Sequence, residues 1–237
     1  MHVLWLALAL QQAPTTRTGE DVIRAMHDRY TGKWYTTLSF VQHNTATKAD
    51  GSQEHYTWHE YARIPGRLRI DFMPADSGDG LVFASDSEYV RQSDTLAHAE
   101  ALIHPLLVLG FDVYAQPLAT SITKLRALGI DLSLVHDDSW EGRPVYVVGA
   151  RAGDVRTKQF WIEKERLLFV RMLEPGRRDT TRMTETRFES YRAVGPVWVS
   201  PRVEFLVDGR QVWLEEYDDI LTGKPLADSL FAPPRRR

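Results

Sequence analysis

Two alternating stretches joined at Pro65-Gly66 constrain the fold of this chain more than any other feature of its sequence. Apolar side chains share one strand face at Tyr56, Trp58, Ala62 and Ile64 before the turn, and at Leu68, Ile70 and Phe72 after it. Proline presets φ for the first central position of a type II turn, and glycine tolerates the positive φ of the second. The sequence therefore predicts a β-hairpin over residues 58–72 with two half-buried arms.

Length and composition favour a single folded domain. The chain has 237 residues, of which 43% are hydrophobic and 26% charged, with a formal net charge of −3. These values argue against disorder and against a nucleic-acid partner. We expect one domain over residues 18–234, followed by a frayed tail at 235–237. Because the chain contains no cysteine, we expect no disulfide, no thiol chemistry and no lipid anchor on cysteine.

The N-terminus resembles a cleaved export signal. Residues 3–10 form an uninterrupted apolar run of the length of a signal-peptide core, too short to span a bilayer as a helix. Ala7 and Ala9 provide small residues for cleavage, and Ala13 is a weaker alternative because Pro14 follows it. We interpret residues 1–13 as a signal peptide and expect a soluble mature protein. A buried first strand or helix is the alternative, because no Lys or Arg precedes the run.

The mature chain begins with a helix and continues into strands. Thr18 and Asp21 resemble a capping box, and an apolar stripe follows at Val22, Ile23, Met26 and Tyr30. Strand patterns include residues 34–42 and 197–207, with a polar loop expected over 44–52. Asp208-Gly209 is a strong hairpin signal leading into a further strand at 211–217. In total we expect about ten or eleven strands.

Two further helices are predicted in the middle of the chain. The first covers residues 95–109, with Asp94 as N-cap and a kink at Pro105. The second covers residues 117–128 and ends at Gly129. Because these helices interrupt a series of strands, we expect them to cover a sheet.

The distribution of aromatic residues favours a hollow sheet. Seven Trp, nine Tyr and nine Phe recur on the strands, often on both faces. We therefore predict an α+β, mostly β fold in which a curved antiparallel sheet forms a half-open barrel covered by helices. Its concave face would line an apolar cavity, and its convex face would carry amphipathic aromatics. A sandwich with surface aromatics is the alternative.

Motifs for catalysis or metal binding are weak. Ser121 and Lys124 have the spacing of serine-lysine hydrolases, but the companion motifs are missing. On a strand His55 and His59 share a face and Glu60 points to the other, which gives too few ligands for zinc. The carboxylates at 215–219 are read as charges that block edge pairing. We expect no catalytic residues, no metal and no cofactor, and hence no enzyme.

Several short segments, in order along the chain, resemble the periplasmic outer-membrane lipoprotein carrier (LolA-like) or lipoprotein-sorting family. They are Leu38–Gln42, Tyr61–Arg69, Gln159–Glu163 and Asp228–Pro234. The resemblance implies a LolA/LolB-like half-open barrel whose cavity receives the acyl chains of lipoproteins. It also implies a periplasmic location and membrane-bound donor and acceptor proteins.

The expected ligand-binding residues combine this resemblance with the strand and helix patterns. Cavity-lining candidates are Phe40, Trp58, Ile64, Leu68, Ile70, Phe72, Phe83, Leu102 and Leu106, with Arg63 and Arg69 at the lid or rim. The family has a functionally important arginine directly before the turn proline, whereas this chain has Ile64 there and Arg63 one residue earlier. A shift of one residue reverses the face of a strand on which a side chain lies.

The sequence thus predicts a monomeric, non-catalytic carrier that binds lipoprotein acyl chains or another lipid or amphiphile. An envelope structural or sensor-type β domain that binds a protein partner is the alternative.

Overall fold

The computed structural model describes residues 17–235, so the expected signal peptide at residues 1–13 lies outside the described residues. Its α-helices are α1 (Gly19–Tyr30), α2 (Pro105–Gly110) and α3 (Leu118–Ala127), and its 3₁₀ turns are η1 (Ala75–Ser77), η2 (Asp112–Tyr114) and η3 (Asp228–Phe231). The strands of the main sheet are β1 (Thr37–Thr47), β2 (Gln53–Arg63), β3 (Arg67–Phe72), β4 (Gly80–Ala84), β5 (Ser87–Gln92), β6 (Thr95–Ala101), β7 (Val135–Trp140), β8 (Arg143–Val148), β9 (Gln159–Glu163), β10 (Leu168–Pro175), β11 (Met183–Glu189), β14 (Arg202–Val207) and β15 (Arg210–Thr222). A separate ribbon pairs β12 (Arg192–Val194) with β13 (Val197–Val199).

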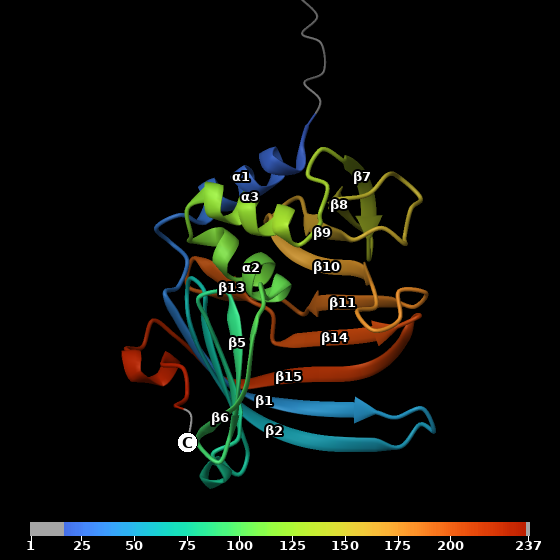
Figure 1. The fold of residues 1–237 in the computed structure, drawn as a ribbon. Helices are drawn as coiled ribbons and strands as arrows, with labels where there is room; N and C mark the ends of the chain where they lie inside the picture. Colours follow the sequence, from blue (N-terminus) through green and yellow to red (C-terminus); the bar gives the residue numbers. More distant parts are fainter. Residues whose placement is uncertain (1–16, 236–237) are drawn as a thin grey trace, which may run out of the picture.

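The main sheet is antiparallel and open. Its thirteen strands follow the order β6-β5-β4-β3-β2-β1-β15-β14-β11-β10-β9-β8-β7. The edge strands β6 and β7 do not pair with each other in the described part of the chain, so the curved sheet stays unclosed (Figure 1). Figure 1 also shows the three α-helices gathered against one face of the sheet beside β9 and β10. The predicted half-open barrel covered by helices is therefore confirmed.

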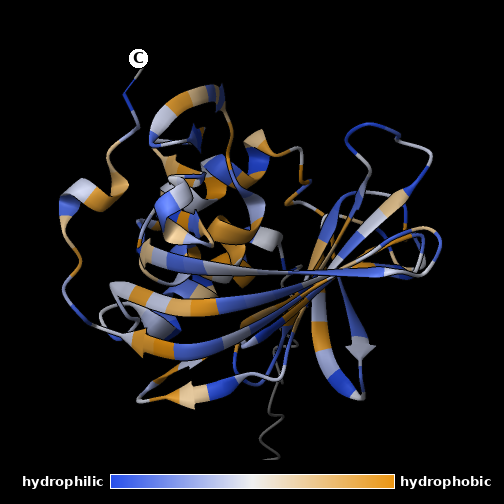
Figure 2. Cartoon of the chain, turned by 90° about the horizontal axis from the view of Figure 1, so that it is seen from below, coloured by the Kyte–Doolittle hydropathy of each residue, from blue (hydrophilic) through white to orange (hydrophobic). Residues whose placement is uncertain are grey.

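The hydrophobic pattern of the strands explains this arrangement. Figure 2 shows hydrophobic and hydrophilic residues alternating along several strands, as expected for a sheet whose two faces differ. The largest core cluster joins the inner face of the sheet to α1, α3 and η2. On the outer face Trp140 and Trp161 pack with valines, and the guanidinium of Arg171 lies 4.2 Å and 4.4 Å from their ring centroids. These contacts give the convex face the amphipathic aromatics that the sequence predicts.

Helix α1 begins as its capping box predicts. The Thr18 backbone N–H donates to the Asp21 carboxylate at 2.9 Å, and the Asp21 N–H donates to the Thr18 hydroxyl at 3.3 Å. The predicted stripe is buried along its whole length, at Val22, Ile23, Met26 and Tyr30. This stripe packs α1 against the sheet. Burial of apolar side chains supplies most of the stability of a short helix.

Tyrosine hydroxyls from the helical layer and from the turn after β11 bind the backbone of β10 and of the turn before it. Tyr114 of η2 accepts a hydrogen bond from the Phe169 backbone N–H at 3.0 Å, and Tyr191 donates to the Phe169 carbonyl at 2.6 Å. Tyr30 of α1 donates to the carbonyl of Arg166 at 2.6 Å. The register of β9 and β10 shifts just after Phe169. A register shift of this kind disrupts the ladder locally, and the hydroxyls satisfy backbone groups there.

The predicted hairpin over residues 58–72 is confirmed. Trp58 lies opposite Phe72 and Ala62 opposite Leu68, so the apolar residues of β2 and β3 share one face. Gly66 has a φ of 78°, the positive value for which glycine was expected.

The helix predicted over residues 95–109 is wrong in its first half. Residues Thr95–Ala101 form the edge strand β6, and only Pro105–Gly110 are helical. Asp94 has a φ of 61° and lies in the turn between β5 and β6, so it does not cap a helix. Pro105 is the first residue of α2 and produces no kink. The backbone of residues 95–101 pairs with β5, and this pairing outweighs the helical spacing of Leu96 and Ala99. On an edge strand these two side chains do not have to pack together as one face of a helix.

Other boundaries also differ from the prediction. The strand expected over residues 197–207 is divided into β13 and β14 at Ser200-Pro201, where proline has no N–H for a ladder. The loop expected over 44–52 shrinks to a turn, because β1 continues to Thr47. The main sheet has thirteen strands instead of about ten or eleven. The α3 helix closely matches the predicted 117–128 segment.

The hydrogen bond between the Tyr114 hydroxyl and the backbone of β10 can be tested by substitution. We expect Tyr114→Phe to lower the free energy of unfolding by about 1–3 kcal/mol, because the buried Phe169 N–H loses its acceptor. Urea denaturation measures this change. Tyr89→Phe is the matched control, because the Tyr89 hydroxyl forms no hydrogen bond within residues 17–235. Equal stability of the Tyr114 variant and the wild type would contradict the role of this hydroxyl.

Candidate ligand-binding cavity

A cavity of about 260 Å³ lies between the concave face of the sheet and α2. Its floor comes from β1 to β5, β11, β14 and β15, and its roof from the segment His104–Phe111 that contains α2. Most of its lining is aliphatic or aromatic. A partly covered hollow with mostly apolar walls is typical of small-molecule sites.

The structure places most of the predicted lining residues at this cavity. Those that line it are Phe40, Trp58, Leu68, Ile70, Phe83 and Leu106. Ile64 belongs instead to the main core under the helices, where it is 5% exposed. Phe72 packs against Trp58 with ring centroids 4.8 Å apart, and Leu102 lines the neighbouring groove.

The cavity adjoins a wider groove of about 650 Å³. The two hollows share Glu88, His104, Leu106 and Phe205, and the groove continues between the His104–Leu106 segment and the loop before β11. The arginines of that loop, Arg177, Arg178 and Arg182, line the groove. Small-molecule sites typically enclose about 300–1,000 Å³. The cavity and the groove together reach this size.

Three carboxyl groups interrupt the apolar wall, those of Glu60 on β2, Glu88 on β5 and Glu215 on β15. Burial and the nearby charge of Glu215 raise the pKa of Glu60 well above its ordinary value. Burial likewise raises the pKa of Glu215 to about 7. The Tyr217 hydroxyl and the Trp213 indole N–H donate to its two oxygens at 2.7 Å and 3.2 Å, and these hydrogen bonds partly lower the pKa of Glu215 again.

His104 contributes a neutral imidazole to the roof. Its Nδ1 accepts a hydrogen bond from the Leu107 backbone N–H at 3.2 Å and so caps the start of α2. Burial lowers the pKa of His104 to about 4. The ring packs edge-on against Phe83, with centroids 4.9 Å apart. At neutral pH this histidine therefore adds no positive charge to the cavity.

Solved structures with the same architecture identify the fold. A LolA superfamily protein from Nitrosomonas europaea has a TM-score of 0.56 and 11% identity, covering 91% of this chain and 98% of that one. An outer membrane lipoprotein-sorting protein domain from Vibrio parahaemolyticus gives 0.59 and 11%, with 90% and 95% covered. A DUF1329 family protein from Desulfovibrio piger gives 0.60 and 13%, also with 90% and 95% covered. The chain has a LolA-like fold. The sequence matches no family model and no curated protein.

Within this LolA-like fold, Ile64 faces the interior and Arg63 the exterior. Arg63 forms an ion pair with Asp228 and donates to the carbonyl of Leu226. Its guanidinium also lies 5.4 Å from the ring centroid of Phe231. Arg63, the last residue of β2, therefore holds the C-terminal segment, whose η3 lies beside β3 and β4.

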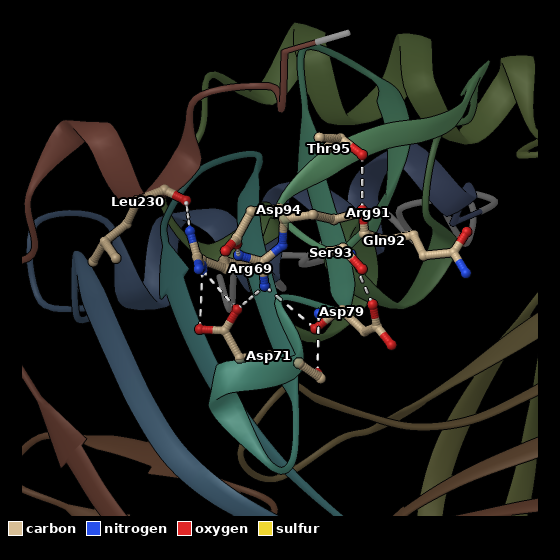
Figure 3. Close-up of polar contacts among 10 residues, drawn as sticks. Arg69, Asp71, Asp79, Arg91, Gln92, Ser93, Asp94, Thr95 and Leu230 are labelled. Carbon is tan, nitrogen blue, oxygen red and sulfur yellow. Dashed lines mark hydrogen bonds and ion pairs between the residues drawn. The ribbon is translucent and has the colours of Figure 1, made fainter. Parts of the chain in front are cut away.

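Arg69 contacts the same segment through a charged network on the outer face. Figure 3 shows Asp71 between Arg69 and Arg91, with the Leu230 carbonyl directed toward Arg69. Arg69 Nε donates to Asp71 at 2.9 Å, and its terminal nitrogen donates to the Leu230 carbonyl at 3.4 Å. Arg91, 7% exposed, also donates to Asp71. The segment continues to Arg235, whose carbonyl accepts from the Leu96 N–H at 2.9 Å, while residues 236–237 lie outside the described part.

The sequence patterns did not predict that Glu60 and Glu215 line the cavity. The run at 215–219 was assigned to edge protection, but β15 is a central strand and Glu215 faces inward. The alternation of the strand did contain a signal for Glu60. Glu60 lies two residues from Trp58 and from Ala62, so it is on the same strand face as these cavity-lining residues. An acidic residue within an otherwise apolar strand face indicates a polar group inside the cavity.

The raised pKa of Glu215 predicts an unusual pH dependence of stability. Between its ordinary value of 4.5 and about 7 the folded protein keeps a proton that the unfolded chain releases, so stability falls as pH rises. We expect Glu215→Gln to reduce this decline by up to about 1.4 kcal/mol per pH unit. The rest of the decline in stability comes from Glu60, whose pKa is also raised. Urea unfolding at pH 5, 6 and 7 measures the slope.

Glu54→Gln is the control for this measurement. Glu54 is exposed, and hydrogen bonds from Lys48 and Tyr56 hold its pKa below the ordinary value, outside the tested interval. The control should show the wild-type slope. An unchanged slope in Glu215→Gln would mean that Glu215 does not titrate in this range.

The contacts of Arg63 predict how the C-terminal segment responds to substitution. We expect Arg63→Ala to accelerate hydrogen exchange at residues 226–232 about tenfold, since charge-assisted hydrogen bonds are lost. Arg67→Ala is the matched control, because its contact with Asp228 is longer, at 3.4 Å, and should have a smaller effect. Binding of an acyl probe should stay within twofold of the wild type. Strong loss of probe binding would instead support the lid or rim role that the family resemblance implies.

Proposed function

We propose that this protein is a non-catalytic carrier that binds acyl chains of lipoproteins, or another lipid or amphiphile, in the cavity under α2. The observation that carries the proposal is the partly covered, mostly apolar cavity of about 260 Å³ on the concave face of the sheet. Removal of an acyl chain from water supplies affinity without directional contacts. The LolA-like architecture supports a carrier role, since one neighbour is described as a lipoprotein-sorting domain.

The roof of the cavity supports reversible binding. Helix α2 has only six residues, and Leu106 and Leu107 from it line the cavity. One hydrogen bond from Leu107 to the His104 side chain caps its start. Val108 and Leu109 anchor the far side of α2 in the main core, but a helix this short opens at lower cost than a strand of the sheet. We infer that ligand exchange requires α2 to move away from β3 and β4.

The location and partners follow from the same proposal. The expected signal peptide would bring the chain to the periplasm, where a lipid carrier takes its ligand from a donor protein in one membrane and delivers it to an acceptor in another. No helix within residues 17–235 combines the length and hydropathy needed to cross a bilayer. A monomer is the simplest state for such transfer, because each molecule then carries its own ligand.

The serine-lysine motif does not favour a hydrolase. The hydroxyl of Ser121 is buried and accepts a hydrogen bond from Gln116 at 2.9 Å. Lys124 pairs with Asp86 at 2.5 Å. The two side chains thus have separate partners, and the lysine is not placed to activate the serine.

Lipid analysis of the protein purified from its native host tests the proposal directly. We expect mass spectrometry of the organic extract to reveal a stoichiometric lipid or acylated peptide. Empty protein that also fails to bind fluorescent acyl probes would overturn the proposal. Co-purification of one stoichiometric protein partner with lipid-free protein would favour the structural or sensor-type alternative.

A variant that fills the cavity provides the corresponding test by substitution. Leu106→Trp places a larger side chain at the roof of the cavity, so we expect affinity for a fluorescent acyl probe to fall at least about tenfold. Leu221→Trp is the matched control, because Leu221 is 51% exposed on β15 and does not line the cavity. Probe titration of both variants, with far-UV circular dichroism as a folding check, gives the comparison. Equal affinity of the two variants would place probe binding elsewhere.

A further inference from the structure

The charges of the cavity lining are all of one kind. Glu60, Glu88 and Glu215 line it, whereas the described lining residues include neither Lys nor Arg. The remaining titratable lining groups are His104, held neutral by burial, and Tyr217. An acyl chain alone does not need acidic groups in its binding site, because apolar contacts suffice for it.

Glu60 is the unusual member of this set. It is 6% exposed, and in the sheet it lies between Phe40 of β1 and Ile70 of β3. Its carboxyl forms no hydrogen bond or ion pair within residues 17–235, although it borders the cavity. Burial of an unpartnered carboxyl group costs stability, and most buried polar groups in proteins have a partner. The fold itself gives this carboxyl no role.

Glu215 stands on the same wall in a different state. Tyr217 and Trp213 donate hydrogen bonds to its two oxygens, which fix its position. The phenol ring of Tyr217 also stacks on Phe40 at 4.2 Å, next to Glu60 in the register of β1 and β2. The cavity thus holds one positioned carboxyl group and one with free hydrogen-bonding capacity.

We propose that Glu60, supported by Glu215, binds the protonated amine of a lipophilic ligand whose apolar part extends through the cavity toward the groove. This inference rests on the proposed carrier function and specifies the chemistry of the ligand. An ammonium group has three N–H donors and a positive charge, so it satisfies the free carboxyl and compensates both acidic groups. A hydroxyl end group carries no charge that would stabilise the ionised form of these carboxyl groups, and a carboxylate end group would disfavour that form further.

Three probes with the same chain and different end groups test the proposal: dodecylamine, dodecanol and dodecanoate. Each competes below its micellar concentration with a fluorescent acyl probe at pH 7. We expect dodecylamine to bind at least about tenfold more tightly than dodecanol, and dodecanoate to bind most weakly. In Glu60→Gln we expect the advantage of the amine over the alcohol to fall about tenfold while dodecanol affinity stays the same.

Two further variants complete the design. Glu54→Gln lies on the same strand in an exposed position, so it removes one negative charge outside the cavity and should keep the preference for the amine. Glu215→Gln should lower the preference as well and replaces Glu60→Gln if that variant does not fold. Equal affinities of the amine and the alcohol in the wild type, or a preference that survives both cavity substitutions, would overturn the inference and leave the carrier function intact. Failure of all three probes to bind would overturn the carrier function itself.

Discussion

The central constraint on this structure is that a few short helices must cover the concave face of a thirteen-stranded sheet. Helices α1 and α3 with η2 fill the part beside β8, β9 and β10, where tyrosine hydroxyls satisfy the backbone around Phe169. The other part, beside β1 to β4, is covered only by α2 and its flanking residues. Because protein interiors are normally close-packed, incomplete cover leaves either a collapsed sheet or a cavity. The long paired strands β1, β2 and β15 keep the sheet from collapsing, so the cavity persists.

The same constraint explains why the two ends of the helical layer differ. Around α1 the aromatic rings of Tyr30, Trp34 and Tyr114 are in mutual contact, with centroids 4.0–5.3 Å apart. Above the cavity α2 contributes only leucines to the lining, together with His104 before it and Phe111 after it. On its other side α2 buries Val108 and Leu109 in the main core. The helical layer thus combines a tightly packed aromatic part with an aliphatic part that borders free volume.

The alternation of residues predicted most of the fold. It did not predict strand β6 or the positions of Glu60 and Glu215 at the cavity. Pro65-Gly66, Asp208-Gly209 and the Thr18 capping box are local signals, and each appears where it was predicted. The segment 95–101 has helical spacing, and only pairing with β5, a tertiary contact, makes it a strand. Glu215 looked like a surface charge because its meaning depends on β15 lying in the centre of the sheet, which a single sequence does not reveal. The free volume between α2 and the sheet likewise depends on packing across many elements, so local patterns predicted only some of its lining.

The order Arg63-Ile64-Pro65 at the hairpin turn determines which side chain faces outward and which faces inward. With isoleucine before the proline, the inward face of β2 presents Trp58, Glu60, Ala62 and Ile64, and it carries no cation. Arg63 is displaced to the outer face, where it pairs with Asp228 and fixes the C-terminal segment. Ile64 lies in the main core and does not line the cavity. Neither Lys nor Arg lines the cavity within the described residues, so the charge of Glu60 and Glu215 has to be balanced by protons, as their raised pKa values indicate, or by an external cation.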